Sequence, residues 1–95
     1  MENLSQLIEI AEKAIELDRH ERDVRFYSDA LGSGYDQFKE DRGIQHIERG
    51  TPEWAEMMEV TKPDFAKQED AKRHARNAKR RLQTAIRRLE KRRAT

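Results

Sequence analysis

The sequence contains no cysteine, which excludes disulfide bonds and thiolate metal ligands as sources of stability. No apolar run approaches the roughly 18 residues that a membrane-spanning helix requires. The N-terminus, Met1-Glu2-Asn3, lacks the basic and apolar regions of a signal peptide. We therefore expect a soluble, cytoplasmic protein that does not contact a membrane.

Motifs for catalysis and cofactor binding are also missing. There is no GxSxG motif, and Gly32-Ser33-Gly34 is too short for a phosphate loop and lacks the Lys-Ser/Thr that would hold phosphate and magnesium. His20, His46 and His74 are widely separated, and none belongs to an HExxH-type pattern. We expect no enzyme activity, no cofactor, no bound metal and no small-molecule substrate.

Large aliphatic side chains are few and charged ones are many. Leu, Ile, Val and Phe number 17 of 95 residues, whereas Asp, Glu, Lys and Arg make up 41%. This composition approaches that of disordered chains, but the net charge of only +1 allows opposite charges to pair between helices. The class that fits best is a charged helical hairpin or coiled coil. The core of such a hairpin is thin, and self-association into a homodimer would complete it.

The first third of the chain has helical periodicity. Six apolar residues at steps of one, three and four mark one face: Leu4, Leu7, Ile8, Ala11, Ala14 and Ile15. Ile10 and Leu17 widen this face. Val24, Tyr27 and Leu31 resume the pattern, so we predict one helix over residues 4–31. Gly32-Ser33-Gly34 would end it, because glycine commonly follows the last residue of a helix.

Residues 32–50 are the hardest part of the chain to assign. Tyr35 and Phe38 lie in a segment that could form one or two helical turns before Gly43. A short helix, an irregular loop and a brief extended piece over 44–47 all fit this segment.

Thr51-Pro52-Glu53 is the clearest local signal. Threonine at the N-cap, proline at the first position and a carboxylate in the first turn are typical of a helix start. The resulting short helix should span residues 52–60, because Pro63 disfavours helical geometry at Lys62.

A last helix over residues 63–92 should follow. Its apolar stripe contains small residues first and large ones later: Ala71, Ala75, Ala78, Leu82, Ala85, Ile86 and Leu89. The alanine section allows another helix to approach closely. We therefore predict a single all-α domain over residues 1–95, in which two long antiparallel helices form a coiled-coil-like hairpin with a short middle helix.

The last helix is also strongly basic. Residues 72–93 contain eleven Lys and Arg and one acid, Glu90. At 100° per residue, seven of these cations gather on one flank of the apolar stripe: Lys72, Arg73, Arg76, Lys79, Arg80, Arg87 and Lys91. Arg81, Arg88 and Arg92 lie on the other flank.

Two interpretations of this basic flank are open. It could bind a phosphate backbone or an acidic protein surface, in a salt-dependent and largely sequence-independent way. Alternatively, it could be a solvated surface that pairs with acids elsewhere, since residues 1–60 contain 15 acids and 7 bases, for a net charge of −8. No zinc-finger spacing and no aromatic interleaving accompanies it, which argues against sequence-specific DNA recognition.

A second candidate surface is the densest group of bulky side chains, namely Trp54, Met57, Met58 and Phe65. It could contact a protein partner, although filling the core is the commoner role for such a group. In style the chain is similar to small bacterial and bacteriophage accessory proteins that bind or inhibit a larger machine, a similarity that includes no motif and assigns no residue. The functional alternatives are therefore a nucleic-acid-binding module and a protein-binding adaptor or inhibitor, such as a phage anti-defence protein.

Overall fold

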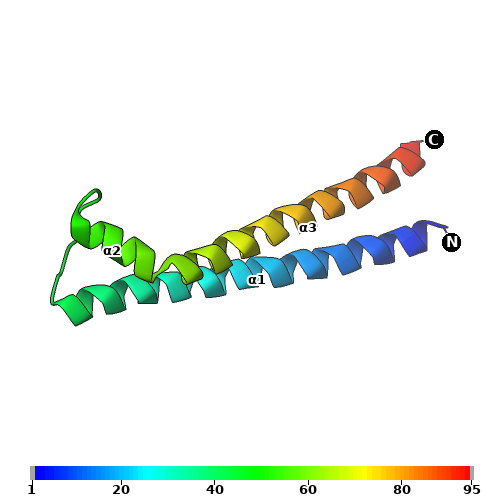
Figure 1. Ribbon diagram of the computed structural model, residues 1–95. Helices are drawn as coiled ribbons and strands as arrows, with labels where there is room; N and C mark the ends of the chain where they lie inside the picture. Colours follow the sequence, from blue (N-terminus) through cyan, green and yellow to red (C-terminus); the bar gives the residue numbers. More distant parts are fainter. Residues whose placement is uncertain (1, 95) are drawn as a thin grey trace.

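The computed structural model describes residues 2–94, which form three helices and, within that range, no strand. Helix α1 (Glu2–Arg42) and helix α3 (Lys62–Ala94) lie side by side in opposite directions, and α2 (Pro52–Val60) is a short helix at the closed end of the hairpin (Figure 1). Both ends of the chain lie at the other end of this rod, which measures 64 × 20 × 18 Å. The predicted fold, an all-α antiparallel hairpin with a short middle helix, is confirmed.

The hairpin is held together along a seam with the spacing of a coiled coil. On α1, ten buried or half-buried residues alternate at steps of four and three: Gln6, Ile10, Lys13, Leu17, His20, Val24, Tyr27, Leu31, Gly34 and Phe38. On α2 and α3 the matching residues are Met57, Thr61, Asp64, Gln68, Ala71, Ala75, Ala78, Leu82, Ala85 and Leu89. Such a repeat keeps one stripe of each helix facing its partner over many turns.

The two sides of the seam differ in side-chain size. Large apolar residues occur on α1 at every seventh position: Ile10, Leu17, Val24, Leu31 and Phe38. On α3, Ala71, Ala78 and Ala85 are buried, as expected of the alanine section. Polar contacts join the helices too, since the side-chain amide of Gln68 donates to Ser28 Oγ over 2.9 Å.

The predicted end of the first helix was wrong. Helix α1 passes through Gly32 and Gly34 and continues to Arg42. Gly34 lies in the seam, and a Cβ there would be 3.4 Å from Thr61 Cγ2 and from Asp64 Oδ2, so the missing side chain permits close packing. The actual stop is Gly43.

Gly43 has a φ of +65°, a conformation that glycine adopts without a steric penalty. Its N–H donates to Glu40 O over 3.1 Å, and the N–H of Ile44 donates to Lys39 O over 2.9 Å. These two bonds form a Schellman motif, which satisfies the last carbonyls of α1.

The predicted apolar face of α1 was wrong in the first half of the helix, whereas Val24, Tyr27 and Leu31 lie in the seam as predicted. Leu4, Leu7, Ile8 and Ile15 are 44–56% exposed, whereas Ile10 and Leu17 lie in the seam. The first half of α1 is apolar on two opposite sides, and both sides satisfy helical periodicity. Contact with α3 selects one of them.

The connection between the long helices is short and irregular. Of the three alternatives for residues 32–50, helix is correct up to Arg42 and irregular backbone is correct from Gly43 onward. Helix α2 begins as predicted, because Thr51 Oγ1 accepts a hydrogen bond from the Trp54 N–H over 3.2 Å. It ends at Val60, also as predicted.

An ion pair joins α1 to α2 at this end. The Arg42 guanidinium donates to both carboxylate oxygens of Glu56 and lies over the Phe38 ring, with its carbon 4.8 Å from the ring centre. The hydrogen bonds from Arg42 lower the pKa of Glu56, and those to Glu56 raise the pKa of Arg42. This pair holds α2 against the end of α1.

Candidate polyanion-binding surface

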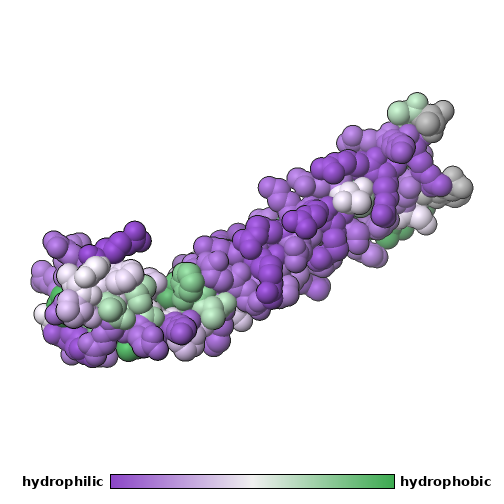
Figure 2. Space-filling model, turned by 45° about the horizontal axis from the view of Figure 1, so that its top comes forward, coloured by the Kyte–Doolittle hydropathy of each residue, from purple (hydrophilic) through white to green (hydrophobic). Residues whose placement is uncertain are grey.

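The seven cations on the predicted basic flank lie along α3 outside its seam, and we call them the outer basic face. Lys72, Arg76 and Arg80 also border grooves between α3 and α1. Arg80 illustrates the geometry, because it is two residues, or about 200°, from each of the seam residues Ala78 and Leu82. Six of the seven are exposed and one is half-buried: Lys72, Arg73, Arg76, Lys79, Arg80, Arg87 and Lys91. The surface of the rod toward the chain termini is mostly hydrophilic in Figure 2.

The outer basic face is long. From Arg73 to Lys91 the helix rises by about 27 Å at 1.5 Å per residue. This length corresponds to about eight base pairs of duplex at 3.4 Å each. A row of cations of this length can lie along several consecutive phosphates.

Few acids neutralise this face. Lys72 pairs with Glu69 over 3.6 Å and Arg73 pairs with Asp70, in both cases within α3. In the part of the chain that the structure describes, the other five cations form no ion pair within 4.0 Å: Arg76, Lys79, Arg80, Arg87 and Lys91. No member of the face pairs with an acid of α1.

Acids of α1 border both flanks of α3, since Glu21 lines one groove between the helices together with Lys72 and Arg76. Glu16 pairs with Arg81, which is not part of the outer basic face. Glu9 lines a shallow groove between α1 and α3 together with Arg80, Arg81 and Arg88, without forming an ion pair. The acids of α1 therefore lie beside both edges of α3, but among the described residues none of them forms an ion pair with the outer basic face.

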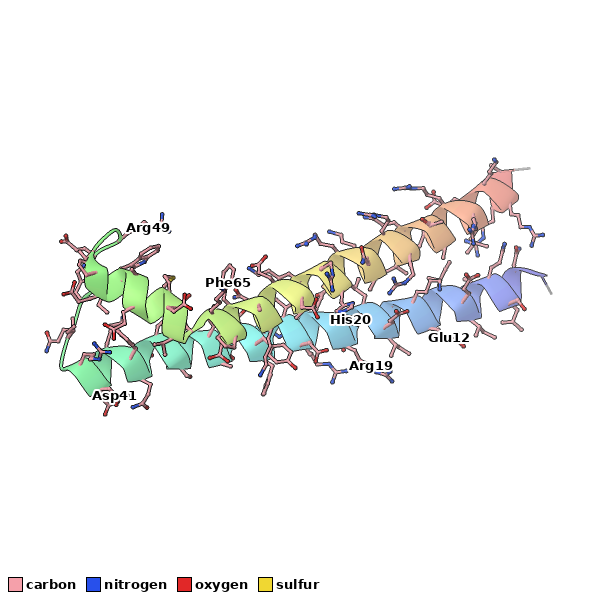
Figure 3. The ribbon with its side chains drawn as sticks, in the orientation of Figure 1. Glu12, Arg19, His20, Asp41, Arg49 and Phe65 are labelled. Atoms are coloured by element: carbon pink, nitrogen blue, oxygen red, sulfur yellow. The ribbon has the colours of Figure 1, made fainter. Side chains whose placement is uncertain are left out.

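The second candidate group is divided by the fold. Met57 is 6% exposed and belongs to the seam, whereas Trp54 and Met58 are half-buried. Phe65 is 48% exposed and points away from α1 (Figure 3), and Val60 nearby is 60% exposed. An apolar patch is visible over α2 and the start of α3 (Figure 2).

The structure brings together two of the three histidines. The rings of His20 on α1 and His74 on α3 are stacked at the seam, with centres 5.6 Å apart and planes at 20°. His20 lies 3.9 Å from Glu16 and His74 lies 3.6 Å from Asp70. His46 is exposed in the connection. Across the described residues, no three His, Cys, Asp or Glu side chains are grouped as metal ligands would be.

Sequence reasoning missed this histidine pair and the seam side of the first half of α1. The seam could have been found from Ile10, Leu17, Val24, Leu31 and Phe38, which recur at intervals of seven. The histidine pair can be predicted only when the register between α1 and α3 is known.

Comparisons with models of protein families, with curated proteins and with solved structures found no match. None of the helices over residues 2–94 combines the length and apolar composition needed to cross a lipid bilayer.

Proposed function

We propose that this protein is a non-catalytic, cytoplasmic nucleic-acid-binding module that contacts the phosphate backbone through the outer basic face of α3. The observation that supports this proposal most strongly is that seven cations lie along one flank of α3 and that, within residues 2–94, none pairs with an acid of α1. A surface composed of solvated Lys and Arg binds phosphates by releasing condensed counterions. Such binding depends strongly on salt and weakly on base sequence.

The test is a binding titration against labelled duplex and single-stranded oligonucleotides of several sequences at a series of salt concentrations. Replacing Arg76 and Arg80 with Glu should weaken binding to every sequence. It should also reduce the slope of log K against log salt by about one unit for each lost phosphate contact.

A matched control uses Arg19→Glu with Arg49→Glu. Both arginines are exposed, lie outside α3 and have no ion-pair partner among the described residues, and Arg19 points away from α3 (Figure 3). This double variant has the same net charge as the α3 variant and should bind nearly as well as the parent protein. Absence of measurable affinity in the parent protein at low salt would eliminate the proposal.

A second candidate function is supported by the exposed Phe65 and Val60 beside the half-buried Trp54 and Met58. Aromatic and methionine side chains of this kind are enriched where proteins contact one another. The alternative is thus a protein-binding adaptor or inhibitor of a larger bacterial machine. A pull-down from the native host with and without nuclease distinguishes the two, because a partner that survives nuclease treatment and is lost in Phe65→Ser supports protein binding.

A further inference from the structure

A groove between α1 and α3 is lined by cations from both helices, and we call it the central groove. Three of its lining residues come from α1 and three from α3: Glu21, Val24, Arg25, Lys72, Ala75 and Arg76. Lys72 and Arg76 belong to the outer basic face, whereas Arg25 lies far from it in the sequence. The basic surface therefore continues from α3 onto α1 at this groove.

The floor of the central groove is apolar. Val24 and Ala75 are half-buried seam residues, and the short side chain of Ala75 leaves space between the helices. The groove has a volume of about 370 Å³, which is near the lower end of the range for small-molecule sites, about 300–1,000 Å³. This volume suits one charged group together with part of the molecule that carries it.

The register of the hairpin places Arg25 and Arg76 toward opposite ends of the groove. His20 of α1 is stacked on His74 of α3, so these two residues lie at the same level of the rod. Arg25 is five residues beyond His20, and Arg76 is two residues beyond His74 in the opposite direction. The two arginines are therefore about 10 Å apart along the rod. A group bound midway lies about 5 Å from the level of each, which the long arginine side chain spans.

The charges of the central groove are only partly compensated. Arg25 and Arg76 are exposed, and within residues 2–94 neither forms an ion pair within 4.0 Å. Lys72 pairs with Glu69 over 3.6 Å. Glu21 lines the groove without pairing with any of its cations. Three cations and one acid leave the lining of the groove with a net charge of +2.

We propose that the central groove binds a phosphate group between the guanidinium groups of Arg25 and Arg76, with the ammonium group of Lys72 beside them. A guanidinium group donates two parallel hydrogen bonds to phosphate oxygens. A phosphate group has enough oxygens to accept from donors on two helices at once, whereas a carboxylate has only two. The apolar floor keeps water from one side of these bonds and strengthens them.

This inference rests on the function proposed above for the source of the phosphate. When a nucleic acid lies along the outer basic face, one of its phosphates enters the groove beside Lys72 and Arg76, and Arg25 brings α1 into the interface. A free phosphate compound carries the same group and is the other source. Glu21 opposes both ligands, because its carboxylate repels a phosphate bound in the same groove.

The first test compares two arginines of α1 in titrations with labelled oligonucleotides. Arg25→Gln should weaken binding about three- to tenfold at low salt and reduce the slope of log K against log salt by about one unit. Arg19→Gln is the matched control, because Arg19 is also exposed, has no ion-pair partner among the described residues and points away from α3 (Figure 3). It has the same net charge as Arg25→Gln and should bind nearly as tightly as the parent protein.

The acid of the groove allows a comparison of opposite sign. Glu21→Gln should bind oligonucleotides more tightly than Glu40→Gln, which removes an exposed acid near the other end of α1. Equal affinities of these two variants would place the phosphate outside the central groove. Circular dichroism should show the helix content of the parent protein in all four variants.

The second test uses inorganic pyrophosphate in the absence of nucleic acid. In NMR spectra of the ¹⁵N-labelled full chain, pyrophosphate should shift the side-chain Nε–H signals of Arg25 and Arg76 more than that of Arg19. Arg25→Gln should reduce the shift of the Arg76 signal. Sodium chloride at the same ionic strength controls for screening.

The two tests separate failure of the groove from failure of the proposed function. If oligonucleotides bind but Arg25→Gln equals Arg19→Gln, and pyrophosphate shifts all three arginine signals equally, the groove proposal is overturned and the function stands. If oligonucleotides do not bind but pyrophosphate selects Arg25 and Arg76, the groove binds free phosphate compounds and the nucleic-acid function fails. Absence of binding in both tests overturns both proposals.

Discussion

Individual glycines in this chain have opposite effects on α1. Gly32 is helical, and a Cβ there would meet no atom within 4 Å, so its flexibility serves no visible packing purpose. Gly43 has a φ of +65°, where other residues are strained, and it supplies the turn that ends the helix. The same residue type therefore weakens the helix at one position and terminates it at the other.

Alanine substitutions should separate these two roles. Gly32→Ala should raise the free energy of unfolding by about 0.5–1 kcal/mol, because alanine loses less backbone entropy than glycine in a helix. Gly43→Ala should lower it by about 1 kcal/mol, because the Cβ is strained at positive φ. Urea unfolding followed by circular dichroism measures both, and a stabilising Gly43→Ala would contradict the proposed role of Gly43.

The Arg42–Glu56 pair predicts a pH-dependent contribution to stability. Because the pKa of Glu56 is lower in the folded chain, its contribution is complete above the ordinary carboxyl pKa of 4.5 and is lost as the pH falls through the lower folded value. The Tm difference between the parent protein and Glu56→Gln should therefore be larger at pH 7 than well below the folded pKa. The control is Glu59→Gln, because Glu59 is an exposed acid of α2 that has no ion pair among the described residues. The Tm difference between the parent protein and Glu59→Gln should not change with pH.

At the level of elements, α1 is apolar on two opposite sides and packs only one of them within the chain. Leu31 in the seam is 5% exposed, whereas Ile15 on the outer stripe is 56% exposed. Removing side-chain atoms from a packed site leaves a cavity, while removing them from an exposed site does not. The two stripes should therefore respond differently to the same kind of substitution.

Leu31→Ala should lower the free energy of unfolding by about 2–3 kcal/mol. Ile15→Ala should change it by less than about 0.5 kcal/mol when the chain is dilute enough to be monomeric. Thermal or urea unfolding at low concentration tests this contrast. Equal losses at the two positions would show that the seam has been assigned to the wrong side.

The whole molecule is electrically polarised, with acids concentrated on α1 and bases on α3. Residues 61–95 contain 13 bases and 4 acids, for a net charge of +9. Glu16 of α1 pairs with Arg81 of α3, and among the described residues no acid of α1 forms an ion pair with the outer basic face. Pairing within the chain therefore accounts for only part of the charge pattern.

Replacing Glu9, Glu12 and Glu16 with Gln should lower stability only slightly, because exposed ion pairs contribute less than about 1 kcal/mol each. The same triple variant should bind nucleic acid more tightly, since it removes negative charge beside α3. The control replaces Glu40, Glu48 and Glu59, three exposed acids that lie outside the stretch of α1 beside the basic end of α3 and have no ion-pair partner among the described residues. A similar gain in affinity in both variants would show that only net charge matters.

The sequence by itself determined the helical class, the start of α2 and the boundaries of α2 and α3 to within two residues. These features depend on local interactions, such as the Thr51 cap, Pro52 in the first turn and the periodicity of the alanine stripe, which neighbouring residues establish without the rest of the fold. The seven cations of the outer basic face could be grouped for the same reason, because helical geometry places them on one side of α3 wherever that helix lies.

Only the tertiary structure decided which side of α1 is buried, whether Gly32 and Gly34 interrupt that helix, and which acids meet which bases. Each of these depends on the register between α1 and α3, which links residues far apart in the sequence. The local sequence predicts a helix end at Gly34, yet Thr61 and Asp64 pack against this residue and the helix continues. Two apolar stripes satisfy the same periodicity on α1, and a pattern within one helix cannot select between them until a second helix occupies one side.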